Sequence, residues 1–172
     1  MQPKHDGKRL LIHKSGQDVT GMNRRGIECE IPESIRAAAL ALPCDFLMDG
    51  EAVGDVLHAF DLLELDAADI RQISYRDRLV RLLNLLATGQ QIGIAWVATI
   101  SGPAAKQMVF RQLRKDGAEG VVFKRIRAPY SPERPDSGGD YFKYTFVQPA
   151  PAVSATVEKL SSNILTSTKN TL

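Results

Sequence analysis

The chain has 172 residues, with 44% hydrophobic side chains, 24% charged side chains and a formal net charge of +2 at pH 7. These proportions are ordinary for a globular protein, and the small net charge does not by itself indicate a nucleic-acid partner. Two cysteines are too few for a disulfide framework and lack the spacing of a zinc site. Because no transmembrane run or signal peptide is recognisable, we expect a cytoplasmic protein without a membrane partner.

The first part of the chain shows strand and helix patterns. Residues 8–14 predict a strand that runs into a turn. Residues 32–43 place alanines and leucines between two prolines, which predicts a short helix. Two apolar runs at 45–54 and 56–65 meet at a Gly-Asp pair, and this pattern is typical of a hairpin with a tight turn.

The middle of the chain predicts two helices on either side of a strand. Leucines within residues 74–87 recur at spacings of three, four and seven, which is typical of an amphipathic helix. Residues 92–100 predict a strand. Residues 102–117 predict another helix, because basic residues occupy its last turn and Gly117 follows them.

Two further strands are predicted at residues 118–125 and 141–147, on either side of a proline- and glycine-rich loop at 128–140. Strands and helices that do not alternate regularly indicate an α+β fold with mainly antiparallel sheets. After residue 146 the composition changes, because Pro, Ala, Ser and Thr become frequent. We therefore expect a domain over residues 1–146 and a linker or poorly ordered tail over 147–172. No oligomer signature is visible, so we expect a monomer.

Candidate functional residues occur in six short units that combine charged and apolar side chains. Basic residues cluster in several of them, which suits a phosphate-rich partner as well as an ordinary solvated surface. Neither a Walker P-loop nor a G-x-G-x-x-G fingerprint is present. Taken singly, each unit has an ordinary structural reading, such as an Asp-Gly turn or a solvated strand. The units are KHDGKR (4–9), NRRG (23–26), MDGEAV (48–53), AFDLL (59–63), EGVVFK (119–124) and YFKYTF (141–146).

Together and in this order, the six units resemble the motifs of the covalent nucleotidyltransferase superfamily, and most of all those of the adenylation domain of an ATP-dependent DNA ligase. The resemblance covers roughly residues 2–146. It implies an ATP-grasp-like nucleotidyltransferase domain that uses ATP and Mg²⁺ and forms a lysyl-AMP intermediate. It also implies transfer of AMP to the 5′-phosphate at a nick in double-stranded DNA. RNA ligases and guanylylating capping enzymes share these motifs, so their substrates stay open as alternatives.

The resemblance makes Lys4 the nucleophile that attacks the α-phosphate of ATP. A lysine attacks only as the neutral amine, and its ordinary pKa is about 10.4. The resemblance also places Lys124 and Lys143 near this amine. Neighbouring cations favour the neutral form and stabilise the charge that develops on the phosphate. Asp6 and Gly7 would form the turn that aims Lys4.

Five further residues are implied to hold the nucleotide or the metal. Arg9 would reach the ribose or a phosphate, and Phe60 would stack on the adenine ring unless it is a core phenylalanine. Gln2 stands where these ligases commonly carry a glutamate, and its carbonyl can accept the same hydrogen bond from the adenine amino group. Glu51, which also contacts the nucleotide, and Glu119 would hold Mg²⁺, a hard cation that prefers carboxylate and phosphate oxygens.

Three more arginines have implied roles. Arg24 would contact a phosphate of the DNA or of the nucleotide, and Arg25 would contact the DNA backbone. Arg78 either resembles a further ligase arginine or is a surface residue of the helix predicted at 74–87.

The sequence departs from the family pattern in three respects. The fifth motif usually reads Lys-x-Lys, but Thr145 occupies the position of the second lysine. The family carries an OB-fold domain after this motif, and residues 147–172 are too few to form one. The chain also begins just before the nucleophile. We therefore expect a truncated ligase that does not seal nicks efficiently alone. The alternative is a catalytically impaired remnant that only binds nucleotide or nicked DNA.

Overall fold

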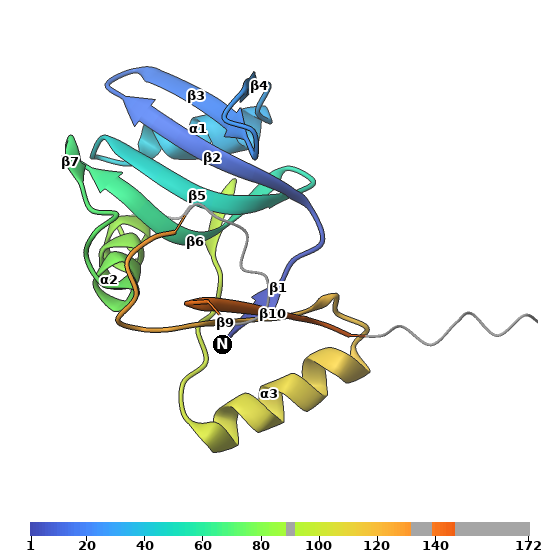
Figure 1. Ribbon diagram of the computed structural model, residues 1–172. Coiled ribbons are helices and arrows are strands. Elements are labelled where there is room, and N and C mark those ends of the chain that lie inside the picture. The colour runs from blue at the N-terminus through green and yellow to red at the C-terminus, as the bar shows by residue number, and fades with distance from the viewer. Residues whose placement is uncertain (89–91, 132–138, 147–172) are drawn as a thin grey trace, which may run out of the picture.

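The computed structural model describes residues 1–88, 92–131 and 139–146, which form two β-sheets and three helices (Figure 1). The predicted α+β class with mainly antiparallel sheets is confirmed. The tail predicted at 147–172 and part of the predicted loop at 128–140 lie outside the described residues. Among the described residues, no helix is long and apolar enough to cross a membrane.

The larger sheet has the strand order β4-β3-β2-β5-β6-β7, and all of these neighbours pair antiparallel. A short strand, β8, pairs with β6 in parallel. The predicted hairpin is confirmed: it is β5 and β6, joined at Gly54, whose φ of 56° suits a glycine. The strands are β2 (Lys8–Ser15), β3 (Asp18–Asn23), β4 (Glu28–Cys29), β5 (Phe46–Val53), β6 (Val56–Leu65), β7 (Ala68–Asp69) and β8 (Ile94–Trp96).

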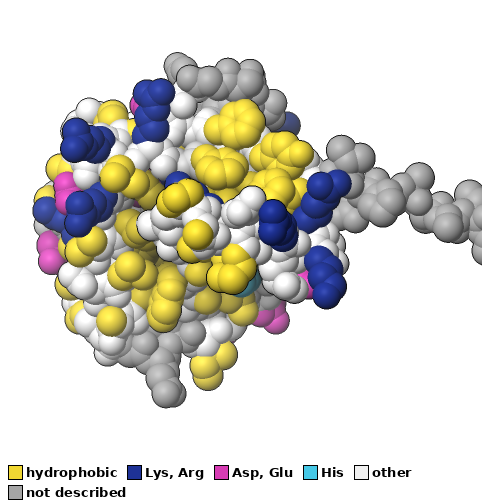
Figure 2. Space-filling view, turned by 90° about the horizontal axis from the view of Figure 1, so that it is seen from below, with side chains coloured by type: hydrophobic (Ala, Val, Ile, Leu, Met, Phe, Trp, Pro, Cys, Tyr) yellow, Lys and Arg dark blue, Asp and Glu magenta, His cyan; other side chains and the backbone are white. Residues whose placement is uncertain are grey.

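The smaller sheet has the order β1-β9-β10 and is antiparallel throughout. Its strands are β1 (Gln2–Lys4), β9 (Gly120–Lys124) and β10 (Tyr141–Thr145). Helix α3 (Pro103–Lys115) lies on the side of this sheet that faces away from the larger sheet (Figure 1). Seen from the α3 side, hydrophobic side chains are exposed among lysines and arginines (Figure 2). The face of the small sheet that does not carry α3 is turned toward the large sheet.

Each sheet has its own hydrophobic core. The large sheet packs with helices α1 (Glu33–Ala41) and α2 (Tyr75–Leu86), and its core includes Ile12, Met48 and Leu82, which are fully buried. The Ser74 hydroxyl caps α2 by accepting a hydrogen bond from the Asp77 amide at 3.2 Å, which confirms the predicted start of this helix.

The apolar run at residues 92–100 forms hydrogen bonds with both sheets. Its strand is therefore shorter than the sequence predicts. Only Ile94–Trp96 pairs within the large sheet, although a strand is predicted over 92–100. The Val97 amide still donates to the carbonyl of Ala59 at 2.8 Å, but the Ile100 amide donates to the carbonyl of Met1 at 2.8 Å. The chain thus leaves one sheet for the other within three residues.

Two strands near the N-terminus have no clear pattern in the sequence. Strand β1 contains Pro3, which is tolerated because β1 lies at the edge of the small sheet. Strand β3 is largely polar, and a Cβ on its Gly21 would lie 2.2 Å from the side chain of Ile31. Pairing with β9 and β2 stabilises these segments as strands, and such pairing partners are not visible in a local window.

Candidate active site

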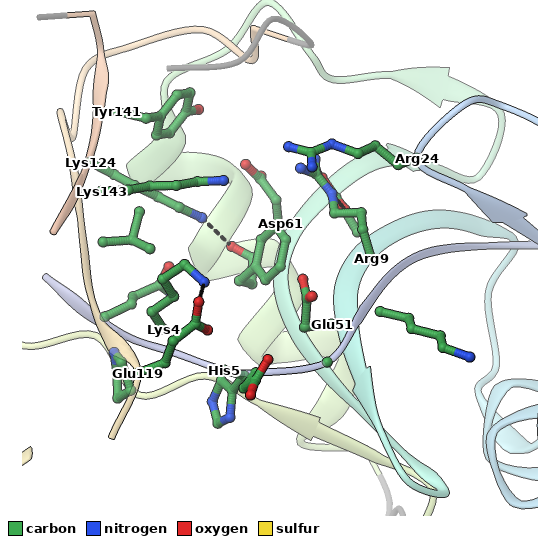
Figure 3. Close-up of a pocket in the computed structure, with 18 of the residues that line it drawn as sticks. Lys4, His5, Arg9, Arg24, Glu51, Asp61, Glu119, Lys124, Tyr141 and Lys143 are labelled. Atoms are coloured by element: carbon green, nitrogen blue, oxygen red, sulfur yellow. Dashed lines mark hydrogen bonds and ion pairs between the residues drawn. The ribbon is translucent and has the colours of Figure 1, made fainter. Parts of the chain in front are cut away.

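A cavity of about 850 Å³ lies between the facing sides of the two sheets (Figure 3). The segment from β1 to β2, the strands β5 and β6, and the strands β9 and β10 all contribute to its wall. Every residue assigned to the nucleotide, the metal or the DNA from the sequence lines this cavity. These residues are Gln2, Lys4, Arg9, Arg24, Arg25, Glu51, Phe60, Glu119, Lys124 and Lys143.

Lys4 ends strand β1 and points into the cavity, where its ammonium forms an ion pair with the carboxylate of Glu119 (Figure 3). The pairing of β1 with β9 produces this contact, because Lys4 lies opposite Gly120 and Glu119 directly precedes that residue. A Cβ on Gly7 would lie 2.3 Å from the carbonyl oxygen of Ala52. Glycine is thus required where the chain leaves Lys4 and passes close to β5.

Lys124 lies at the end of β9 among aromatic rings. Its ammonium donates to the carbonyl oxygen of Phe60 at 3.1 Å and lies 4.5 Å from the ring centroids of both Phe60 and Tyr75. Burial lowers the pKa of Lys124 to about 8, although the carboxylates of Asp61 and Asp49 act in the opposite direction. This lysine therefore loses its proton at a lower pH than an ordinary lysine does.

Lys143 enters the cavity from β10 (Figure 3). Burial lowers its pKa, and the neighbouring charges of Arg24, Arg9 and Lys4 lower it further. The basic side chains predicted from separate motifs therefore gather in one region. Such a concentration of positive charge suits a polyphosphate.

Arg9 is held by groups that the sequence analysis did not assign. Its guanidinium forms a bidentate ion pair with the fully buried Asp49, with Nε 2.6 Å from Oδ1. The Tyr130 hydroxyl accepts from Arg9 at 3.1 Å and donates to Asp49 at 3.1 Å. Burial raises the pKa of Asp49, and Arg9 opposes that effect. The guanidinium also lies 5.3 Å from the Phe60 ring centroid, at the cavity wall.

Arg78 is completely buried, so the interpretation of it as a surface residue is wrong. Its guanidinium forms two hydrogen bonds with the carboxylate of Asp61, at 2.8 and 3.0 Å. It also donates to the carbonyl of Ile73 at 2.6 Å and to the Tyr141 hydroxyl at 3.0 Å. Arg78 thereby links α2 to β6 and to β10 through Asp61 and Tyr141, which both line the cavity.

The two carboxylates assigned to a metal both line the cavity. One carboxylate oxygen of Glu119, Oε2, is buried without a hydrogen-bond partner among the described residues. Burial raises the pKa of Glu51, while Arg9 and Lys4 lower it. In the part of the chain that the structure describes, no three His, Cys, Asp or Glu side chains come together as a metal site. A cation here would need further oxygen ligands from a substrate or water.

The residues assigned to the adenine ring come from different sheets, Gln2 from β1 and Phe60 from β6. The Gln2 side chain is buried, and its amide nitrogen donates to the Val97 carbonyl at 3.3 Å and to the Thr99 hydroxyl at 3.1 Å. An amide carbonyl oxygen such as that of Gln2 can accept a hydrogen bond. Phe60 is partly exposed to the cavity and belongs to neither hydrophobic core. The interpretation of Phe60 as a core residue is therefore wrong.

The arginines assigned to DNA lie in an exposed turn after β3. The Asn23 side chain accepts from the Arg25 amide at 2.8 Å, and Gly26 has a φ of 74°. Arg24 extends toward Arg9 (Figure 3), whereas both Arg24 and Arg25 keep exposed surface. The turn thus carries two cations at the rim of the cavity.

The structure brings together two histidines, His5 and His58, that the sequence analysis did not single out. The rings of His5 and His58 are stacked, with centroids 4.0 Å apart and planes inclined by 18°. Burial lowers the pKa of both imidazoles. The contact between these histidines could not be predicted from the local sequence, because the two residues are far apart in the sequence and lack a metal-ligand spacing.

The fold is that of the nucleotidyltransferase domains of DNA ligases. The chain belongs to the ATP-dependent DNA ligase domain family, whose model matches residues 55–144, more than half of the chain. A probable DNA ligase from Nocardioides is 32% identical over 158 residues, which cover 76% of this chain and 30% of that relative. The chain thus spans about a third of the length of the curated relatives it matches.

Solved structures support the same relationship. The ligase domain of LigD from M. tuberculosis aligns with a TM-score of 0.67 and 29% identity, over 84% of this chain and 52% of that domain. A mycobacterial DNA ligase D complexed with ATP and MES aligns with a TM-score of 0.66 and 29% identity, over 84% of this chain and 53% of that one. The second structure shows that a similar protein binds ATP.

Proposed function

We propose that this chain is the adenylation domain of an ATP-dependent DNA ligase, in which Lys4 becomes covalently linked to AMP. The observation that carries the proposal is the position of Lys4: it points into the cavity, pairs with Glu119 and lies in the region that contains Lys143 and Arg9. Membership of the ligase family and the ATP complex of a similar protein support it.

The chemistry of the step is nucleophilic substitution at phosphorus. The Lys4 ammonium first loses a proton to solvent, and the free amine attacks the α-phosphorus of ATP. A phosphorus–nitrogen bond forms, the bond between the α-phosphorus and the oxygen that bridges to the β-phosphate breaks, and pyrophosphate leaves. A second proton leaves the nitrogen, which gives the phosphoramidate. Lys124 and Lys143 stabilise the charge that develops on the phosphate oxygens.

Mg²⁺ fits this site because Glu51 and Glu119 present carboxylate oxygens and one Glu119 oxygen is buried without a partner among the described residues. Such a cation would neutralise negative charge on the phosphates. Glu119 pairs with Lys4 in the structure, so releasing its carboxylate would also free the Lys4 amine. Phe60 offers a ring for stacking on adenine, and the Gln2 carbonyl offers an acceptor for its amino group.

The proposed second substrate is nicked double-stranded DNA. Its 5′-phosphate would attack the α-phosphorus of the lysyl-AMP and release Lys4, and a 3′-hydroxyl would then displace AMP. Arg24 and Arg25 at the rim suit a phosphate backbone, and ligase relatives support DNA over RNA. A comparison of nicked DNA, nicked RNA and GTP as substrates distinguishes a DNA ligase from an RNA ligase or a capping enzyme.

The proposal is tested by incubating the chain with Mg²⁺ and ATP labelled at the α-phosphate. We expect acid-labile, base-stable label on the wild type and on Lys115→Ala, an exposed lysine of α3, but none on Lys4→Ala. Absence of label from folded wild-type protein that still binds ATP would favour the alternative, a remnant that only binds nucleotide or DNA.

A further inference from the structure

We propose that the stacked rings of His5 and His58 are a positioning pair that holds the Lys4 segment against strand β6. This inference rests on the proposed adenylation of Lys4 and adds two residues to it. His5 directly follows Lys4, and His58 lies on β6 two residues before Phe60. Rings whose centroids are 4.0 Å apart and whose planes are nearly parallel are in full stacking contact.

The stack lies where the backbone has no sheet partner. Pairing of β1 with β9 ends at Lys4, opposite Gly120, and pairing of β2 with β5 begins at Lys8, opposite Ala52. Residues 5–7 therefore cross from the small sheet to the large sheet outside both ladders. The contact of the His5 ring therefore restricts the conformational freedom of Lys4, the residue before it.

The contact also relates Lys4 to the rest of the site. His58 lies opposite Glu51 in the pairing of β5 with β6, so the stack joins the nucleophile segment to the strand pair that carries this carboxylate. In Figure 3, His5 and Tyr141 lie on opposite sides of Lys4. Tyr141 receives a hydrogen bond from Arg78, which joins the sheets on that side. On the other side, the histidine pair joins the segment that follows Lys4 to strand β6 of the large sheet.

The pair is better described as a stack than as part of a metal site. Among the described residues, no cluster of three or more potential metal-binding side chains includes these histidines. The proposed role therefore depends on the flat rings and not on metal binding. This distinction makes the proposal testable by substitution.

The test compares His58→Phe, which keeps a flat ring, with His58→Leu, which keeps an apolar side chain without a ring. The readout is the single-turnover rate of AMP transfer to Lys4 at several ATP concentrations. We expect His58→Leu to lower the maximal rate by roughly three- to tenfold, the range of an aromatic pair, with unchanged half-saturating ATP. His58→Phe restores most of the rate. The double variant with His5→Leu is no slower than either single variant, because both remove one contact.

A second readout does not need ATP chemistry. Reaction of Lys4 with trinitrobenzenesulfonate, followed by peptide mapping, should accelerate in His58→Leu and remain as in wild type in His58→Phe, while the exposed Lys8 reacts equally in all variants. Wild-type rates and wild-type Lys4 reactivity in His58→Leu, or additive losses in the double variant, would overturn the proposal. If the wild type fails to label, the proposed function fails and the Lys4 reactivity still decides the role of the stack.

Discussion

At the scale of single residues, Lys124 shows how burial changes the proton affinity of a side chain. Its ammonium lies among aromatic rings, and its pKa falls to about 8. In the unfolded chain its pKa is near the ordinary value, so between about pH 8 and 10.5 the unfolded state binds more protons than the native state. The free energy of unfolding must then rise with pH across this window.

We predict that Lys124→Met removes this contribution. The wild type should gain stability relative to the variant as the pH is raised from 7.5 to 9.5, because the cost of burying the charged amine disappears once the native lysine is neutral. Urea unfolding of both proteins at the two pH values measures the difference. Equal changes in both proteins would show that Lys124 retains its ordinary pKa in the folded state.

Thr145 gives a second prediction at this scale. It lies opposite Gly120, which in turn lies opposite Lys4 on the other side of β9. Thr145→Lys would supply the second cation of the usual family pattern, so we expect faster AMP transfer to Lys4, by a fewfold, from added phosphate contact. The single-turnover label assay measures it, with Thr145→Gln as a neutral control of similar length. An equal effect of both substitutions would contradict a role for charge.

At the scale of an element, α2 is anchored through Arg78. We predict that Arg78→Leu destabilises the protein by about 3–5 kcal/mol, because Asp61 is then left buried without its partner. The double variant with Asp61→Leu should recover part of the loss, since it removes the unpaired charge as well. Denaturant unfolding of the three proteins gives the coupling energy. A double variant that loses the sum of both single effects would contradict the expected coupling.

The same helix shows what the sequence can predict. The leucine spacing of α2 gives its position and its buried face, because amphipathicity is a local property. It does not show that Arg78 points inward, because the acid that pairs with it lies 17 residues away on β6. Lys4, Glu51 and Phe60 could be assigned through motif order. Asp49, Tyr130 and the histidine stack could not, since their partners are set by strand pairing.

At the scale of the whole molecule, the cavity is a cleft between two sheets with separate cores. A nucleotide bound there contacts both sheets, so binding should stabilise the folded chain as a unit. At an ATP concentration of one hundred times Kd, the expected gain is about 2.7 kcal/mol, which corresponds to roughly 5–10 °C in Tm for a chain of this size.

This prediction is checked by thermal unfolding of Lys4→Ala with and without Mg²⁺ and ATP, since that variant lacks the proposed nucleophile. Phe60→Ala on the same background should reduce the shift, because the ring offered to adenine is lost. An unchanged Tm at saturating nucleotide would show that the cleft does not bind ATP across both sheets.

The pairing of β1 with β9 has a consequence for biosynthesis. Glu119, the carboxylate partner of Lys4, lies 115 positions later in the chain, so a ribosome adds it long after Lys4. A nascent chain therefore exposes the Lys4 side chain before strand β9, which pairs with β1, has been translated. Because β9 and β10 both line the cavity, the proposed reaction of Lys4 with ATP requires that both strands have been translated.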